Sequence, residues 1–324
     1  MNRVAALLAA VLLAVPMAAC AAPTRQTGTT SAAPAPASTP FTVAFITHQA
    51  PGDTFWDLVR RGAEAAAAKD NVDLQYFHDP DAAGQAAMVT DATGRKVSGI
   101  AVTLPNPPVL SASVQAAVSA GVPVVALNTG IGDWRALGAL EYIGQDDGLA
   151  GRTVGERLTR EGAKNVLCVI QQAGHVGLEA RCAGAAATFA GTVQKLYVDG
   201  TRTPEVKAAI VAELQQDRSI DRVLTLSAPV ALATLEAAGE ANSYAKVVTF
   251  DTNTAVIEAI KRGTISWAVD QQPFLQGYLA VDSLWLYLTN RNVIGGGQPT
   301  LTGPSFVDGS NVDEVAERAR EGTR

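Results

Sequence analysis

Short apolar runs alternate with helix-like segments from residue 41 onward, and this alternation leaves few folds open to the chain. Strands separated by helices of this length indicate parallel βαβ units. Runs such as "GIAVTL" and "VPVVAL" are apolar throughout, as expected for parallel strands buried on both faces. In the first half, strand-like runs occupy 42–47, 72–77, 98–103 and 122–127, with helix-like segments that include 55–70 and 109–121.

The same rhythm restarts in the second half of the chain. Strand-like runs occupy 164–170, 193–198, 221–226, 246–250 and 265–269, and helix-like segments occupy 148–160, 177–190, 204–217, 229–240 and 273–290. With 324 residues the chain is long enough for two domains. The sequence therefore predicts an α/β protein with two doubly wound parallel-sheet lobes. Because no Pro/Gly-rich linker separates the two sets, the lobes are expected to be joined by short backbone crossings.

The first forty residues have the pattern of an export signal followed by a tether. Arg3 precedes an apolar run, 4–15, which ends in "PMAAC" at 16–20. A basic start, a short apolar segment and small residues are typical of an exported chain. The small residues before Cys20 favour a lipoprotein signal, 1–19, with Cys20 as the lipidated residue; the alternative is a plain secretory signal. Residues 20–40 are rich in Ala, Pro, Ser and Thr, a composition that predicts a disordered tether.

Charge and motifs disfavour several classes of function. The net charge of −6 and the lack of a Lys/Arg cluster argue against nucleic acid as a partner. The chain has neither a GxSxG nucleophile elbow nor a GxxxxGK[ST] phosphate loop. Its three histidines, His48, His78 and His175, lack metal-ligand spacing. We therefore expect no enzyme activity, no cofactor and no metal.

Polar and aromatic residues follow the predicted strands. In open α/β sheets, ligands bind beyond the carboxyl ends of the strands. Amides and carboxylates suit the paired donors and acceptors of hydroxyl groups, and aromatic rings suit the C–H faces of a sugar. This inventory predicts a neutral polyhydroxylated ligand, although helix caps and turns use the same residue types. The residues are His48, Asp53, Phe55, Trp56, Pro105, Asn106, Asn128, Thr129, Gln171, His175, Glu179, Arg181, Ser227, Asp251, Asn253, Asp270 and Gln271.

Two further cysteines lie in a strand-like run and in the helix-like segment after it. Cys168 is in "NVLCVI", and Cys182 comes early in the next helix. A strand and its following helix pack together, and disulfides persist outside the cytoplasm. The pair either forms a disulfide or remains as two buried thiols.

Several motifs resemble the ribose-binding-protein group of type I periplasmic binding proteins, the sugar receptors of ABC importers. They are "THQAPGDTFW" (47–56), "GIAVTLPNP" (99–107), "GVPVVALNTG" (121–130), "ALEYIGQDD" (139–147), "VGLEARCAG" (176–184), "VVTFDTN" (247–253) and "AVDQQPFLQGYLAV" (268–281). The resemblance implies two lobes around a ligand cleft, joined by three crossings near 144–146, 271–273 and 300–304. Lobe one is then 41–144 plus 273–300, and lobe two is 145–271 plus 301–324.

The resemblance also implies roles for individual residues. Phe55 and Trp56 match the aromatic pair that stacks on the sugar ring. Asn128 takes the place of a ligand-binding carboxylate, and Ser227 replaces an Asn. The other expected ligand contacts are His48, Asp53, Thr103, Asn106, Asp251, Gln271 and one of the pair Glu179 and Arg181, the resemblance leaving open which of these two it is.

The implied function is capture of a sugar or sugar alcohol. The protein is expected as a monomer on the outer face of the cell membrane, anchored through Cys20 and delivering its ligand to an ABC permease and ATPase. A ligand-presenting sensor for a membrane signalling receptor is the main alternative. A LacI-type regulator shares the fold but needs a DNA-binding segment where this chain has a signal and tether.

Overall fold

Two six-stranded sheets organise the computed structural model, which describes residues 40–324; the expected signal (1–19), the lipidation site at Cys20 and the tether up to residue 39 lie outside the described residues. The first sheet has the order β11-β5-β4-β3-β1-β2, and all its neighbouring strands run parallel. Its strands are β1 (Phe41–Thr47), β2 (Val72–His78), β3 (Gly99–Thr103), β4 (Val124–Asn128), β5 (Glu141–Gln145) and β11 (Thr300–Gly303).

The second sheet repeats this topology. Its order is β12-β10-β9-β8-β6-β7, and only β12 runs antiparallel to its neighbour. Its strands are β6 (Asn165–Ile170), β7 (Thr192–Tyr197), β8 (Arg222–Thr225), β9 (Lys246–Phe250), β10 (Ile265–Asp270) and β12 (Ser305–Asp308). The sequence prediction of two doubly wound α/β lobes is confirmed.

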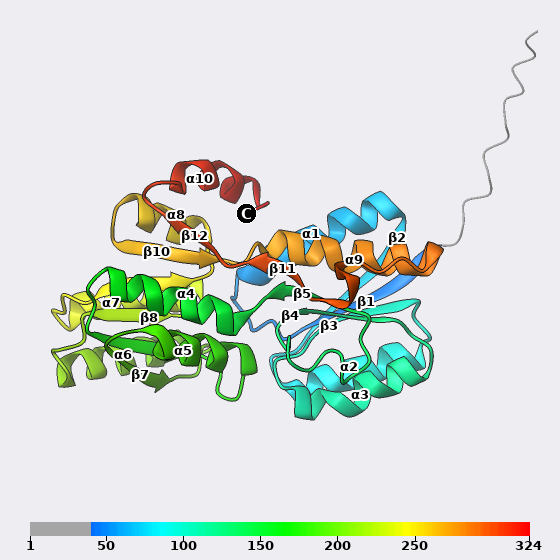
Figure 1. The fold of residues 1–324 in the computed structure, drawn as a ribbon, viewed down its shortest axis with the longest axis horizontal. Coiled ribbons are helices and arrows are strands. Elements are labelled where there is room, and N and C mark those ends of the chain that lie inside the picture. Colours follow the sequence, from blue (N-terminus) through cyan, green and yellow to red (C-terminus); the bar gives the residue numbers. More distant parts are fainter. Residues whose placement is uncertain (1–39) are drawn as a thin grey trace, which may run out of the picture. The chain divides into compact units, whose positions relative to one another are not determined.

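Helices cover both faces of each sheet (Figure 1). In the first lobe, α1 (Phe55–Asp70) and α9 (Pro273–Asn290) pack on one face, and α2 (Ala82–Gly94) and α3 (Pro107–Ser119) pack on the other. In the second lobe, α4 (Asp147–Arg160) and α5 (Val176–Thr188) cover one face. The opposite face carries α6 (Thr203–Gln216), α7 (Ala228–Glu240), α8 (Thr254–Lys261) and α10 (Val312–Glu321). Both central sheets are thus buried between layers of helices, as their apolar strands require.

Glycines allow the closest helix pair to form. A Cβ on Gly62 of α1 would overlap the carbonyl oxygen of Phe274 in α9, and a Cβ on Gly277 would overlap that of Val59. Helix α9 follows β10 of the second sheet in sequence but packs on the first. The tight contact between α1 and α9 therefore fixes the segment that returns from lobe two to lobe one.

Three crossings connect the lobes, at β5 to α4, at β10 to α9 and at β11 to β12. The third lies within the expected range of 300–304, but the boundary of lobe one, expected at residue 300, lies further along the chain. Thr300 and Leu301 pair with β5, and the pairing continues to Gly303. Lobe one therefore extends through Gly303, because β11 satisfies the backbone groups at the free edge of β5. The chain changes lobe at Pro304.

Candidate ligand-binding site

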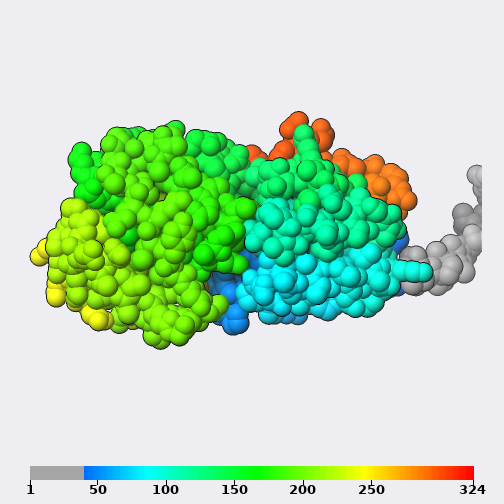
Figure 2. Space-filling model, turned by 90° about the horizontal axis from the view of Figure 1, so that it is seen from below, coloured from blue at the N-terminus to red at the C-terminus, as the bar shows by residue number. Residues whose placement is uncertain are grey.

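A cavity of about 740 Å³ is lined by residues of both lobes, at the carboxyl ends of their strands. The surface is hollowed between the lobes, where residues just after β1 are visible (Figure 2). This is the edge at which open α/β sheets bind ligands. Of the twelve ligand contacts expected from the resemblance, nine line the cavity: His48, Asp53, Phe55, Trp56, Asn128, Arg181, Ser227, Asp251 and Gln271. Gln171 and His175, which also follow predicted strands, line it too.

Three expected site residues do not line this cavity. Thr103 is fully buried, and its hydroxyl lies 2.8 Å from Nδ1 of His48, so that it holds the histidine from behind. Asn106 precedes α3 and lines a smaller cavity of about 300 Å³ beside the main one. Glu179 is partly exposed and accepts a 2.7 Å hydrogen bond from Lys195. Of the pair Glu179 and Arg181, the structure brings only Arg181 to the cavity.

The cavity also has a wall that the sequence prediction omitted. Tyr197 ends β7, and Asp199 and Thr201 follow it in the loop before α6. These residues occupy the same position relative to their strand as the predicted site residues do to theirs. Inspection of the residues after 193–198 would have found them.

Equivalent strands of the two sheets each place a polar side chain at the end of the cavity nearest the crossings between the lobes, here called the hinge end. Asn128 ends β4 and Asp251 follows β9, the corresponding strand of the second sheet. Both have left-handed backbones, with φ of 67° and 64°, a region that Asn and Asp tolerate better than most residues. Gln271 links them, because it accepts from Asn128 Nδ2 at 3.2 Å and donates to Asp251 Oδ1 at 2.7 Å. The amides and the carboxylate are therefore fixed in one orientation.

The positive charge of Arg181 is balanced within the protein. Its Nε donates to Oδ1 of Asp147 at 2.8 Å, and its Nη1 lies 4.0 Å from Oδ2 of Asp251. Its guanidinium also packs over the Phe250 ring, 4.7 Å from the centroid. Because the ion pair with Asp147 is buried, Arg181 is a fixed donor with little charge to spare for an anionic ligand.

Two carboxyl groups of the cavity have raised pKa values. Burial raises the pKa of Asp251 to about 7, although Arg181 opposes the shift. Burial raises the pKa of Asp53 to about 6, although the backbone N–H of Phe55 opposes it. A second negative charge would be costly beside these groups. The cavity is accordingly suited to a neutral, hydroxyl-rich ligand.

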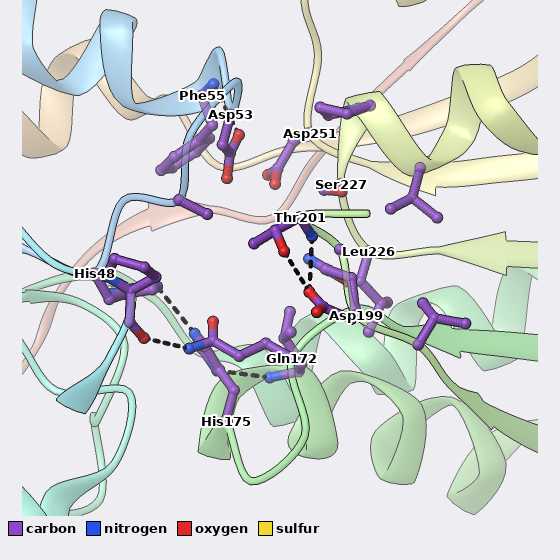
Figure 3. Close-up of a pocket in the computed structure, with 18 of the residues that line it drawn as sticks. His48, Asp53, Phe55, Gln172, His175, Asp199, Thr201, Leu226, Ser227 and Asp251 are labelled. Atoms are coloured by element: carbon purple, nitrogen blue, oxygen red, sulfur yellow. Dashed lines mark hydrogen bonds between the residues drawn. The ribbon is translucent and has the colours of Figure 1, made fainter. Parts of the chain in front are cut away.

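A pair of buried histidines joins the lobes across the cavity. Nε2 of His48, after β1, lies 3.0 Å from Nε2 of His175, which caps α5 (Figure 3). Nδ1 of His175 accepts from the backbone N–H groups of Gly177 and Leu178, so that its proton sits on Nε2. His175 then donates to His48, and His48 donates through Nδ1 to Thr103. Both rings are neutral in this arrangement.

Burial keeps these histidines neutral. Burial lowers the pKa of His175 to about 3, with a further contribution from Arg181. Burial also lowers the pKa of His48 well below its usual value, and the neighbouring His175 and Arg181 act in the same direction. Protonation of either ring would place a charge in an apolar interface.

Three further contacts between the lobes surround the cavity. The backbone N–H of Val176 donates to the Pro105 carbonyl at 3.0 Å. The Gln172 amide donates to the Pro80 carbonyl at 3.2 Å, and the Asn253 amide donates to the Thr54 hydroxyl at 3.2 Å. These bonds lie on both sides of the cavity, so the structure has the lobes in mutual contact.

The aromatic pair after β1 has a double role. Phe55 and Trp56 meet edge to face with ring centroids 5.1 Å apart, and both also belong to the core beneath α1. The His48 ring packs edge-on against Trp56 at 4.7 Å. Only about 5% of Phe55 and 3% of Trp56 remains exposed. The rings therefore combine core packing with a rigid apolar wall for the cavity.

Other sequence questions concern residues away from the cavity. Cys168 and Cys182 form a disulfide with their Cα atoms 6.1 Å apart, which joins β6 to α5.

Trp134 and Trp267 lie in hydrophobic cores. Within residues 40–324, no cluster of three or more His, Cys, Asp or Glu side chains has the geometry to hold a metal ion. No helix in that range is long and apolar enough to cross a membrane.

A two-lobed α/β fold with a polar cavity between the lobes is the architecture expected of a solute-binding protein. The family model described as "Periplasmic binding protein domain" matches residues 43–292, and the chain belongs to this family. The expected resemblance to type I periplasmic binding proteins is thereby confirmed.

Similar proteins include solved structures and a curated relative. A carbohydrate transporter from Acidothermus cellulolyticus, solved in complex with myo-inositol, is 55% identical, covers 88% of this chain and 100% of its own, and superimposes with a TM-score of 0.87. A periplasmic sugar-binding protein from Legionella pneumophila is 27% identical over 81% of this chain and 99% of its own, with a TM-score of 0.75. The xylose/arabinose-binding protein XylF from Sulfolobus acidocaldarius is 26% identical, and the match covers 69% of this chain and 61% of that protein.

Proposed function

We propose that this protein is an extracytoplasmic receptor that captures a cyclic polyol or sugar, with myo-inositol as the first ligand to test. The observation that carries the proposal is the chain of oriented polar groups from Asn128 through Gln271 to Asp251. Support comes from the similar Acidothermus structure, which was solved with myo-inositol.

The chemistry of the cavity supports a neutral ligand. Carboxylates such as Asp251 accept from ligand hydroxyls, while the Arg181 guanidinium and the amides donate to them. Arg181 is paired with Asp147, and the cavity adds the carboxyl groups of Asp53 and Asp251. A phosphate or carboxylate on the ligand would lie beside these carboxyl groups without a free cation to balance its charge.

Aromatic rings supply the apolar part of the site. A cyclic polyol has a C–H face as well as hydroxyl groups, and Phe55 and Trp56 offer rigid rings at the wall of the cavity. Because both rings are packed in the core, little side-chain entropy is lost when they contact a ligand. We therefore keep the role expected from the sequence, in which Phe55 and Trp56 stack on the ring of the ligand.

Isothermal titration calorimetry against myo-inositol, pentoses, hexoses and linear polyols tests the ligand class. We expect Asp251→Ala and Gln271→Ala to weaken binding by at least about 30-fold, the effect of losing about 2 kcal/mol at a buried polar contact. Glu179→Gln is the matched control, because Glu179 lies outside the cavity and its loss should leave affinity unchanged. Failure of all these sugars and polyols to bind would refute the ligand class, and an affinity of either alanine variant equal to that of wild type would refute the proposed site.

Anchoring and delivery form the second part of the proposal. We propose that Cys20 carries the lipid, that residues 20–40 tether the folded body to the membrane surface, and that a monomer delivers its ligand to an ABC permease and ATPase. This role requires binding and release but no catalysis. Replacement of Cys20 by Ser should release the protein from the membrane fraction, whereas Cys20→Ser with unchanged membrane association would exclude the lipid anchor.

A further inference from the structure

The cavity is longer than one polyol ring requires. Three strand spacings separate the ends of β9 and β7 in the second sheet, which puts Asp251 and the loop after β7 roughly 14 Å apart. A ring polyol with about 12 non-hydrogen atoms occupies at most roughly 360 Å³ if each atom is given the volume of a water molecule, about 30 Å³. The cavity measures about 740 Å³. About half of it therefore lies beyond a ligand bound at the hinge end.

This outer half has its own set of residues. It lies toward β7, the strand at the edge of the sheet opposite the crossings, and Tyr197, Asp199 and Thr201 line it. Figure 3 shows Asp199 and Thr201 hydrogen-bonded to each other among the residues that line the cavity. None of these side chains belongs to the polar chain from Asn128 to Asp251.

An exposed aromatic ring lies at this end of the cavity. Tyr197 is about 51% exposed, although most large apolar side chains of the described residues are buried. A half-exposed ring in a cavity wall offers a flat apolar surface for the C–H face of a sugar. The ring is at the end of β7, an edge strand with several exposed side chains, and it is not part of the hydrophobic cores, so its face is available to a ligand.

Two polar groups beside Tyr197 have unused hydrogen-bonding capacity. Oε1 of Gln171 is buried and accepts no hydrogen bond from residues 40–324, although Gln171 lines the cavity. Oδ1 of Asp199 accepts from the backbone N–H and the hydroxyl of Thr201, at 3.0 and 2.7 Å. These bonds fix the carboxylate and leave its other oxygen for a ligand. A buried acceptor without a donor is costly unless a ligand supplies one.

We propose that the outer half of the cavity is a second sugar-binding subsite, so that the protein takes a cyclic polyol carrying one further sugar ring. Tyr197 stacks on the added ring, and Gln171 Oε1 and the free oxygen of Asp199 accept from its hydroxyls. The carboxylates of Asp81 and Asp199 at this end disfavour an anionic substituent such as phosphate. This inference rests on the proposed function, because it places the polyol itself at the hinge end.

Calorimetry with two probes tests the subsite: myo-inositol, and galactinol, in which the same polyol carries one galactose ring. We expect the wild-type protein to bind galactinol at least as tightly as myo-inositol. Tyr197→Ala should weaken galactinol binding about tenfold or more and change myo-inositol binding less than twofold. Gln171→Ala should show the same selectivity. Tyr244→Ala is the control, because Tyr244 is fully exposed and outside the cavity, and it should affect neither ligand.

The outcomes separate the subsite from the proposed function. Binding of myo-inositol without galactinol overturns the subsite and leaves the proposed function standing. Equal effects of Tyr197→Ala on both ligands, or no effect on either, likewise overturn the subsite. If neither probe binds, the subsite proposal fails, and the proposed function is then decided by the pentoses, hexoses and linear polyols of the calorimetric panel. Because Tyr197 is half exposed, its replacement by Ala should preserve the fold, which far-ultraviolet circular dichroism of the variant checks.

Discussion

The buried histidine pair predicts an acid-sensitive protein, and His175→Asn isolates the effect. His175 caps α5 through Nδ1 and bonds His48 through Nε2. Asn is among the best N-cap residues, so the variant keeps a cap for α5 but has no group that titrates near neutral pH. The comparison therefore measures the cost of keeping this one imidazole neutral inside the protein.

The magnitude follows from the shifted pKa. Burial lowers the pKa of His175 to about 3, whereas an unfolded histidine has a pKa of about 6.5. Above pH 6.5 the ring is neutral in both states and costs nothing. Below pH 6.5 the unfolded state binds a proton that the folded state does not, and stability falls. By proton linkage the loss from pH 8 to pH 5 is about 2 kcal/mol for this residue.

Urea unfolding followed by tryptophan fluorescence, at pH 8 and at pH 5, is the assay. The raised pKa values of Asp53 and Asp251 act in the opposite direction, since the folded state takes up protons on these groups as the pH falls. Wild type and variant share both carboxyl groups, so their effects cancel in the difference. We expect the free energy of unfolding of the variant, relative to wild type, to rise by about 2 kcal/mol from pH 8 to pH 5.

A difference between the two proteins that stays constant over this pH range would refute the reasoning. It would mean that His175 titrates alike in the folded and unfolded states and that the pair does not hold a neutral hydrogen bond. His78→Asn is the control, because His78 is exposed and bonds only a backbone carbonyl. A rise with His175→Asn that His78→Asn does not produce assigns the effect to the buried pair.

Two further predictions concern the scaffold. Gly277→Val should lower the free energy of unfolding by about 3 kcal/mol in urea titrations, because its side chain would overlap the α1 backbone; Gly239→Val, whose Cβ meets no atom within 4 Å, should cost well under half as much. Replacing Cys168 and Cys182 together by Ala should cost about 3 kcal/mol, as expected for a loop with a sequence separation of 14. Reductant should destabilise wild type but not the double variant, and equal responses would contradict the bridge's contribution.

Local patterns in the sequence were sufficient for most of the fold. The apolar runs gave β1 to β4 and β6 to β10 because parallel strands are buried on both faces. Helices α2, α8 and α10 and strands β5, β11 and β12 were not among the expected elements. Helix α2, Ala82–Gly94, is rich in Ala and Gly and has only a few buried positions, so its sequence shows little amphipathic pattern. Residues 301–303 were assigned to lobe two although they pair with β5, because edge pairing is a long-range contact.

Some residues of the candidate site could also be predicted from the sequence, whereas others depended on tertiary packing. Asn128, Asp251 and Gln271 were predicted from their places after strands, since that edge of an open sheet binds ligands whatever the side chain. Glu179 and Arg181 were both candidates. They are two residues apart on α5, where successive residues turn by about 100°, so the two side chains point to nearly opposite sides of the helix. Which side faces the cavity depends on how α5 packs against α4 and the sheet.

The sequence by itself thus determined the class of fold, the repeat of two lobes and the strand ends where a ligand could bind, because these follow from local periodicity. Only the tertiary structure decided which side chains meet. It placed Arg181 beside Asp147 and Asp251, joined His48 to His175 across 127 residues of sequence separation, and opened the outer wall at Tyr197. The contact between His48 and His175 depends on the packing of one lobe against the other, and the contacts of Arg181 depend on the packing of helices and strands within lobe two. No local pattern in the sequence encodes either arrangement.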